Sequence, residues 1–562
     1  EKMRIFIDEI ESRASEEINP PIRSDVIAGF NRVSFIWFLT SPATALTQMT
    51  SIPIRVLPRA GSQYGYANAT KMLTKYMNVL KSVGRTVNEN GERSWLRPSV
   101  GTSTMVTTNP RNKRFFDAGV NHGVFDTLDS ALIAEDRATK DEVAKDLNKI
   151  YKYSTLLFQN SERITREMAF MMNAELAYDA HIKDGKSAEV AEELAIKDAV
   201  EATRDTMGNY REFERPSIMR SDLARAVFLF KMYAVNQTKF LWTNAIQMFK
   251  HEDKATRWRL KKELAGVLMM AGVFGGATAL PLYSTICWLL DMLMGDDDDR
   301  DAEDPFLAND SDSRFRYEWL PSHFGETGGK ILERGLVSYL TGANVSSRVS
   351  LDNLWFRNPQ YSPTYAGKFY NMLEANLGPN VSVASNYAAA ADDFSNGDTD
   401  RGLEKILPAG LKGFATATRL AREGAQTYST DPLVTKDELS TLEIIGAGAG
   451  FQPLDVADAV TKRNAIEAAR SKMKDERTKI LGLYNKTRYN ENATDADWDR
   501  VSAMMEKFNR RYPQPGSAID EDTISRSEKN FDSAREKAVY GSPMTDEELM
   551  YAPWFTEGRN YK

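Results

Sequence analysis

The sequence has a single cysteine, Cys287, among its 562 residues. One thiol excludes an internal disulfide framework and any zinc site built from cysteines. There are four histidines, and none of them stands in a metal-binding pattern such as His-Glu-x-x-His. The sequence also lacks a P-loop, a Gly-x-Ser-x-Gly motif and a dinucleotide-binding fingerprint. We therefore expect no catalytic residues, no cofactor and no metal site, and a protein that is not an enzyme.

Positive charge is not in excess. The chain has 72 Lys and Arg residues against 79 Asp and Glu residues, which gives a formal net charge of −7. Proteins that bind nucleic acid mainly by neutralising phosphates are usually basic, so the composition argues against that class. A charged fraction of 27% and a mean hydropathy of −0.46 exclude an ordinary polytopic membrane protein.

Sustained alternation of polar and apolar residues is absent, so a large sheet is not expected. Helical periodicity recurs instead and predicts an all-α fold: an elongated array of long helices and irregular loops in two or more helical subdomains. Long helices are predicted over residues 154–182 and 188–207. The capping-box motifs Thr435-x-x-Glu438 and Thr494-x-x-Asp497 predict two further helix starts.

Changes in composition divide the chain into consecutive parts. The predicted parts are N-terminal helices with a long loop or arm (1–127), a helical domain (128–295), an acidic linker (296–313), a second helical domain (314–454), and charged C-terminal helices with a tail (455–562). The linker contains the aspartate run Asp296 to Asp299, for which a solvated linker is favoured over a cation site. A cleavable signal pattern is absent, and the sequence begins at Glu1 without a methionine, so we expect a processed product or a piece of a longer polypeptide.

The longest charge-free stretch is residues 264–290. It exceeds the roughly 20 apolar residues that a bilayer-spanning helix needs. Basic residues precede it and aspartates follow it, which would orient a spanning helix with its N-terminal side in the cytoplasm. The basic flank consists of Lys250, Lys254, Arg257, Arg259, Lys261 and Lys262.

Four residues of this stretch are candidates for contact with a membrane or another helix. Gly272 and Gly276 have the small-xxx-small spacing that lets a second helix approach closely, and Pro281 and Trp288 complete the set. Because glycines and a proline make the stretch only moderately hydrophobic, three interpretations stay open. It spans a membrane, it forms a glycine-rich hairpin inside a soluble core, or it is buried in one state and inserts into a membrane in another.

The order of several short segments resembles the C-terminal region of very large phage proteins: the internal virion or ejection proteins of podoviruses and the large polyvalent protein family. Together the segments span most of residues 26–470. They are Asn31-Arg-Val-Ser-Phe with Ala45-Leu-Thr-Gln-Met, Ser161-Glu-Arg-Ile-Thr-Arg, residues 209–216, Phe230-Lys-Met-Tyr, the glycine- and proline-containing hydrophobic segment, Glu333-Arg-Gly-Leu with Ser346-Ser-Arg, and Gly450-Phe-Gln-Pro-Leu-Asp.

The resemblance implies a structural virion protein that lies in the capsid interior and is ejected with the genome. It would oligomerise into part of a DNA-translocating channel or core, an ejectosome, in the host periplasm and inner membrane. The implied partners are further copies of the chain, other internal core proteins, the portal or tail, phage DNA and the host inner membrane. The alternative is a non-catalytic C-terminal fragment of a large virion enzyme, an RNA polymerase or a murein hydrolase, that acts as a scaffold inside the capsid.

Overall fold

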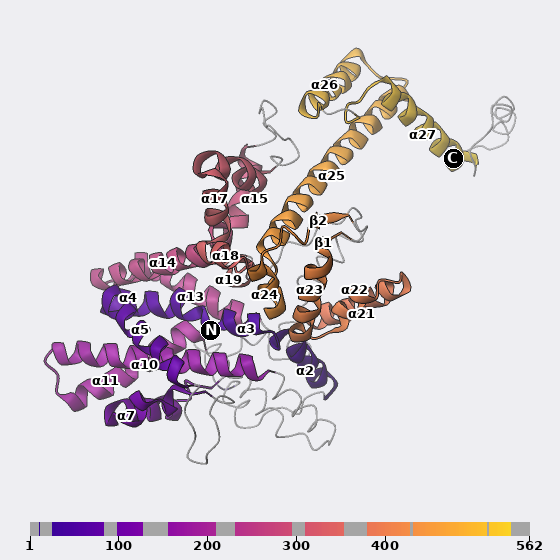
Figure 1. Cartoon of the computed structure of the whole chain (residues 1–562). Coiled ribbons are helices and arrows are strands. Elements are labelled where there is room, and N and C mark those ends of the chain that lie inside the picture. The colour runs from indigo at the N-terminus through magenta and orange to yellow at the C-terminus, as the bar shows by residue number, and fades with distance from the viewer. Residues whose placement is uncertain are drawn as a thin grey trace. The chain divides into compact units, whose positions relative to one another are not determined.

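The computed structural model describes residues 11, 25–83, 98–126, 155–208, 231–294, 310–352, 354, 379–427, 431–513 and 516–540. Over these residues the fold is all-α, as predicted, because helices dominate the regular secondary structure (Figure 1). One small antiparallel sheet joins β1 (Ala425–Gln426) to β2 (Pro432–Val434). Most of the predicted acidic linker, 296–309, lies outside the described residues, as do 84–97 of the predicted loop and the C-terminal tail from 541.

The chain forms two compact units. The first combines residues 1–286 with 319–461, and the second combines residues 287–318 with 462–562. Both units are therefore assembled from stretches that are not adjacent in the sequence. A division of the chain into consecutive parts does not represent such an arrangement.

A paired set of long helices forms the largest core of the first unit. Helix α10 (Leu156–Lys183) runs beside α11 (Ala188–Met207), and a short turn with Gly185 at φ 78° joins them. Ser187 begins α11 because its side chain accepts a hydrogen bond from the N–H of Val190. Around this pair pack α3 (Pro42–Met49), the π-helix η1 (Ile52–Val56), α4 (Leu57–Tyr64), α5 (Tyr66–Val83) and α7 (Pro110–Asn121).

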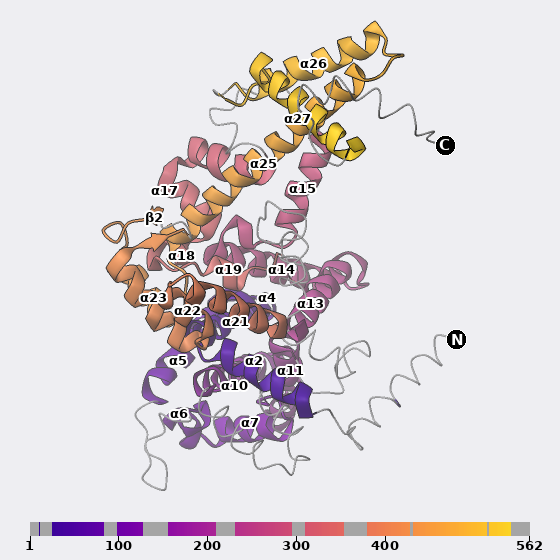
Figure 2. The same ribbon diagram turned by 90° about the vertical axis from the view of Figure 1, so that its right-hand side faces the viewer.

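A helical hairpin and its neighbours form a second core in the same unit (Figure 2). Helix α13 (Lys231–Lys250) packs against α14 (Lys254–Gly275), and α14 also contacts η1 and α4. The other side of α14 contacts α17 (Leu320–Arg334), α18 (Leu336–Thr341) and α19 (Ser346–Val349). The buried side chains of this core are Ile54, Phe240, Val267, Ala271, Ala343, Val345, Val349 and Leu351.

Helix α23 (Ala409–Glu423) and helix α24 (Thr441–Ala449) pack against each other in the first unit, and the core that they form includes residues of the small sheet. A capping box starts α24, in which the side chain of Ser440 accepts from the N–H of Glu443 and the Glu443 carboxylate accepts from the N–H of Ser440. The predicted start at Thr435 is therefore wrong: Thr435 and Glu438 bond to each other in a turn that precedes α24.

The remaining elements complete both units. They are α2 (Asp25–Leu39), η3 (Val100–Thr102), α6 (Thr104–Thr107), η6 (Ala277–Ala279), α15 (Tyr283–Met294), α16 (Ser311–Arg314), η7 (Phe315–Trp319), α21 (Pro379–Ser395), α22 (Thr399–Ile406), α25 (Leu454–Arg488), α26 (Asp495–Arg511) and α27 (Glu521–Tyr540). The core of the second unit consists of Met473, Ile480, Phe508, Tyr512 and Ile519. A capping box at Thr494 and Asp497 begins α26, which confirms the second predicted helix start.

Candidate interaction surface

Residues 264–290 do not form one helix. Helix α14 ends at Gly275, the single turn η6 follows, and α15 begins at Tyr283. The chain direction changes where Gly276 has φ 71° and where Leu282 has φ 65°. The interpretation of residues 264–290 as one continuous spanning helix therefore does not describe this structure. In the described part of the chain, we find no helix that combines the length and the hydropathy required to cross a bilayer.

The two glycines predicted to pack against another helix have different roles. A Cβ atom at Gly276 would overlap the carbonyl oxygen of Glu333 and lie 2.6 Å from the backbone nitrogen of Arg334. Gly276 therefore permits close contact between the end of α14 and the end of α17. Gly272 has no other atom within 4 Å of its Cβ position. The two glycines do not act as one packing pair in this structure, because Gly276 follows the end of α14 and Gly272 faces open space.

Buried charges fix the start of the apolar stretch to the first unit. The carboxylate of Glu263, which is fully buried, accepts hydrogen bonds from Arg59 at 3.0 Å and from Asn244 at 3.3 Å. Arg59 also donates to Asp205 at 3.2 Å. Burial alone would lower the pKa of Arg59, but the charges of Glu263 and Asp205 raise it above its ordinary value. Burial raises the pKa of Asp205, although the charge of Arg59 opposes this effect.

The first part of the apolar stretch belongs to the core. Val267 and Ala271 are fully buried, and Met270 and Phe274 pack against the same cluster. These residues lie three or four positions apart, so they form one face of α14. Pro281 is partly buried in the turn before α15. Up to this turn, the structure matches the interpretation of a glycine-rich segment buried in a helical core.

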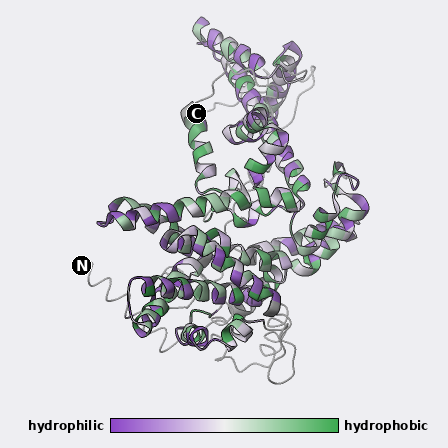
Figure 3. Ribbon diagram, turned by 60° about the vertical axis from the view of Figure 1, so that its left-hand side comes forward, coloured by the Kyte–Doolittle hydropathy of each residue, from purple (hydrophilic) through white to green (hydrophobic). Residues whose placement is uncertain are grey.

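Helix α15 differs because its large apolar side chains face solvent. Ile286 is 54% exposed, Trp288 62% and Met292 58%, and Leu289 and Leu290 are each 41% exposed. Figure 3 shows α15 as a mainly hydrophobic helix. Its first turn is held by Ser284, whose backbone N–H and hydroxyl both donate to the carboxylate of Asp352. Because large exposed apolar patches often mark interaction sites, we take α15 as a candidate interaction surface.

The predicted basic flank lies on the α13–α14 hairpin. Lys250 ends α13, and the other five residues lie in the first turns of α14. The lysines are exposed, and Arg257 and Arg259 are partly buried. Burial lowers the pKa of Arg259, and the nearby charge of Arg59 lowers it further. The structure thus brings the six predicted residues together on one hairpin.

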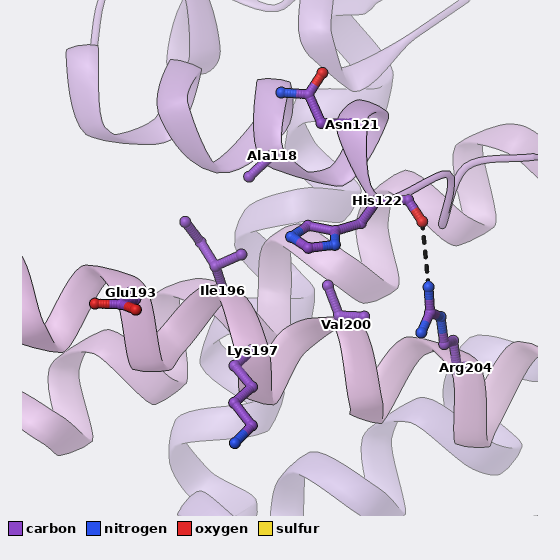
Figure 4. Close-up of a pocket in the computed structure, with 8 residues that line it drawn as sticks. All are labelled: Ala118, Asn121, His122, Glu193, Ile196, Lys197, Val200 and Arg204. Carbon is purple, nitrogen blue, oxygen red and sulfur yellow. Dashed lines mark hydrogen bonds between the residues drawn. The ribbon is translucent and has the colours of Figure 1, made fainter.

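A pocket of about 510 Å³ lies between α7 and α11 (Figure 4). It is lined by Ala118, Asn121, His122, Glu193, Ile196, Lys197, Val200 and Arg204. The backbone carbonyl of His122 accepts a hydrogen bond from the guanidinium of Arg204 at 3.3 Å. Over the described residues, no group of three or more His, Cys, Asp or Glu residues is placed to hold a metal ion. We place the candidate functional site on α15 and the hairpin, because α15 exposes large apolar side chains and the hairpin carries the six basic residues.

Comparisons of the chain with protein-family models, with curated proteins and with solved structures found no match. Sequence reasoning missed the buried pair of Arg59 and Glu263 and the half-exposed Asp205 that also bonds to Arg59. The burial of Glu263 could have been predicted from helical spacing. Gly266 and Val267 follow it by three and four residues, so they lie on the same buried face of α14. Its partner Arg59 is distant in sequence and carried no such signal.

Proposed function

We propose that this chain is a structural phage virion protein that is ejected with the genome and assembles into part of a DNA-translocating channel in the host envelope. The order of its segments supports this role. The observation that carries the proposal is the exposed apolar surface of α15. In this account, α15 joins copies of the chain to one another at the membrane.

The energetics of α15 support a partner for this helix. Burying one large aliphatic or aromatic side chain contributes about 1.5–3 kcal/mol relative to leaving it in water. Much of that stabilisation is missing in α15, because five of its large apolar side chains are exposed: Ile286, Trp288, Leu289, Leu290 and Met292. A lipid interface or a second copy of α15 would recover it.

The length of α15 favours a position along the membrane surface. Its 12 residues extend about 18 Å, against about 30 Å for the hydrocarbon core of a bilayer. A short helix with exposed Trp and Leu residues suits the boundary between headgroups and acyl chains. The conditional behaviour that the sequence suggested for all of residues 264–290 is therefore assigned to α15, and α14 stays in the protein core.

Vesicle flotation tests this proposal. The test variant is Ile286→Ser/Leu289→Ser/Leu290→Ser. Its matched control, Leu411→Ser/Phe414→Ser/Leu442→Ser, replaces three other side chains that are 58%, 63% and 58% exposed. We expect the wild type and the control to float with phospholipid vesicles, and the α15 variant to bind about tenfold less or weaker still. Equal flotation of the α15 variant and the wild type would contradict the proposal, as would a wild type that does not float.

Self-association gives the second readout. Sedimentation velocity in mild detergent is expected to show oligomers of the wild type and of the control, and smaller species of the α15 variant. A monomeric wild type under these conditions would contradict the role of α15 in joining copies of the chain.

A further inference from the structure

Exposed aromatic rings lie among lysines on the α13–α14 hairpin. Trp242 and Phe249 on α13 are each 67% exposed, and Trp258 on α14 is 60% exposed. Rings of this size are usually buried, because each carries a large apolar area. We call Phe249, Trp258, Lys254, Lys261 and Lys262 the hairpin tip.

Cations and rings are paired at the hairpin tip. The Nζ atom of Lys261 lies 6.0 Å from the centre of the Phe249 ring, and Nζ of Lys262 lies 5.4 Å from the centre of the Trp258 ring. The first pair connects α14 to α13, so both helices contribute to one surface. Such pairs place positive charge directly beside exposed apolar area.

Local contacts keep this surface in place. The Asp253 carboxylate begins α14 by accepting hydrogen bonds from the N–H groups of Ala255 at 3.2 Å and Thr256 at 2.7 Å. At the other end, the bond from Asn244 to the buried Glu263 ties α13 to α14. The rings are therefore presented by a hairpin that is fixed at both ends.

The charge at the hairpin is mostly positive. The exposed carboxylates there belong to Glu252 and Asp253, and Asp253 is already engaged as the helix cap. The hairpin also carries four exposed lysines: Lys250, Lys254, Lys261 and Lys262. This balance is complementary to an anionic surface, although the whole chain has a net charge of −7.

We propose that the hairpin tip docks onto anionic phospholipids, with Phe249 and Trp258 at headgroup level and the lysines at the phosphates. This inference rests on the proposed function, because it names the membrane surface that the protein meets. Aromatic rings and lysines are both enriched at membrane interfaces. Single-stranded nucleic acid is the less favoured ligand, because the exposed face of α14 continues to Met269, which is 60% exposed and offers a phosphate or a base no polar contact.

Vesicle co-sedimentation of the full chain tests the inference. The test variant is Lys254→Glu/Lys261→Glu/Lys262→Glu. The control, Lys474→Glu/Lys479→Glu/Lys486→Glu, reverses three exposed lysines of α25 and changes the net charge equally. On vesicles of phosphatidylcholine with phosphatidylglycerol, we expect the hairpin variant to bind at least about tenfold less than the wild type and the control. Circular dichroism and the urea midpoint check that both variants fold.

The outcomes separate this inference from the proposed function. If the hairpin variant binds as well as the wild type while the α15 variant does not, the inference is overturned and the proposed function stands. Wild-type binding that is equal on phosphatidylcholine alone, or insensitive to salt, also overturns the inference and needs no variant. Retention of a single-stranded oligonucleotide by the hairpin without vesicle binding overturns both, because the partner is then a nucleic acid.

Discussion

At the scale of single residues, buried charges hold the first unit together. Arg59 on α4 bonds to Glu263 on α14 and to Asp205 on α11, so three helices meet at one guanidinium. Removing one partner of a buried ion pair is costly, because the remaining charge stays in a medium of low polarity without compensation. The cluster therefore positions α14 and, with it, the hairpin.

We predict that Glu263→Gln lowers the free energy of unfolding by about 3–5 kcal/mol, because it leaves Arg59 without its buried counter-charge. The control is Glu467→Gln, which removes the carboxylate of the exposed pair between Arg463 and Glu467. That change should cost less than about 0.5 kcal/mol. Urea denaturation measures both, and equal effects of the two substitutions would contradict the structural role of Glu263.

Glu167 has an unusual balance of burial and hydrogen bonds. Its fully buried carboxylate accepts from Ser99 Oγ at 2.9 Å, from the N–H of Val100 at 2.6 Å and from Arg163 at 2.8 Å. Burial nevertheless raises the pKa of Glu167 above its ordinary value, and the charge and hydrogen bond of Arg163 offset this only partly. Between the ordinary and the raised pKa, the folded state binds more protons than the unfolded state.

This shift predicts a pH dependence of stability. The unfolded pKa of Glu167 is near 4.5, and the folded pKa is higher. The protein therefore loses stability as pH rises from the unfolded pKa through the folded pKa, and the loss is complete above the folded pKa. Glutamine does not titrate, so Glu167→Gln lacks this contribution. The difference in the free energy of unfolding between the wild type and the variant should therefore be smallest at high pH. Urea denaturation at a series of pH values measures the difference. A gap between the two proteins that widens as pH rises would contradict the raised pKa.

At the scale of elements, the break after α14 is set by a contact that is distant in sequence. We predict that Gly276→Ala destabilises the protein by at least about 2 kcal/mol, because it combines a strained positive φ with overlap at Glu333. Gly272→Ala should be neutral or stabilise by up to about 1 kcal/mol, because alanine favours a helix interior. Thermal unfolding measures the stability of both variants. Equal destabilisation would contradict this prediction and would indicate that the two glycines pack as a pair.

Local patterns predicted many of the helices. Helical periodicity placed helices over residues 154–182 and 188–207, where α10 and α11 are found. The capping box at Thr494 predicted the start of α26, because a cap depends on residues three apart. The similar motif at Thr435 failed, because Ser440 begins the helix in its place. Periodicity also could not predict the end of α14, which depends on the approach of Glu333 to Gly276.

At the scale of the whole molecule, composition and periodicity predict the all-α class but not the assembly of the units. The hydroxyl of Ser41 donates to the carbonyl of Ala449 at 2.9 Å, and the N–H of Gly410 donates to the hydroxyl of Thr40 at 3.0 Å. Such contacts join the beginning of the first unit to its end, and no local signal announces them. The same limit applies to the candidate site. The sequence identified the basic flank and Trp288, but the exposure of α15 and of the hairpin tip depends on which other segments cover each helix.

Hydrogen exchange of the full chain, followed by mass spectrometry with and without phosphatidylcholine–phosphatidylglycerol vesicles, tests whether α15 and the hairpin tip are the surfaces that meet the membrane. We predict slower exchange on vesicles in residues 283–294 and 249–262, and unchanged exchange in α10, whose residues from Thr165 to Ala177 are already buried. Unchanged exchange in residues 283–294 when the protein is bound to vesicles would contradict the account.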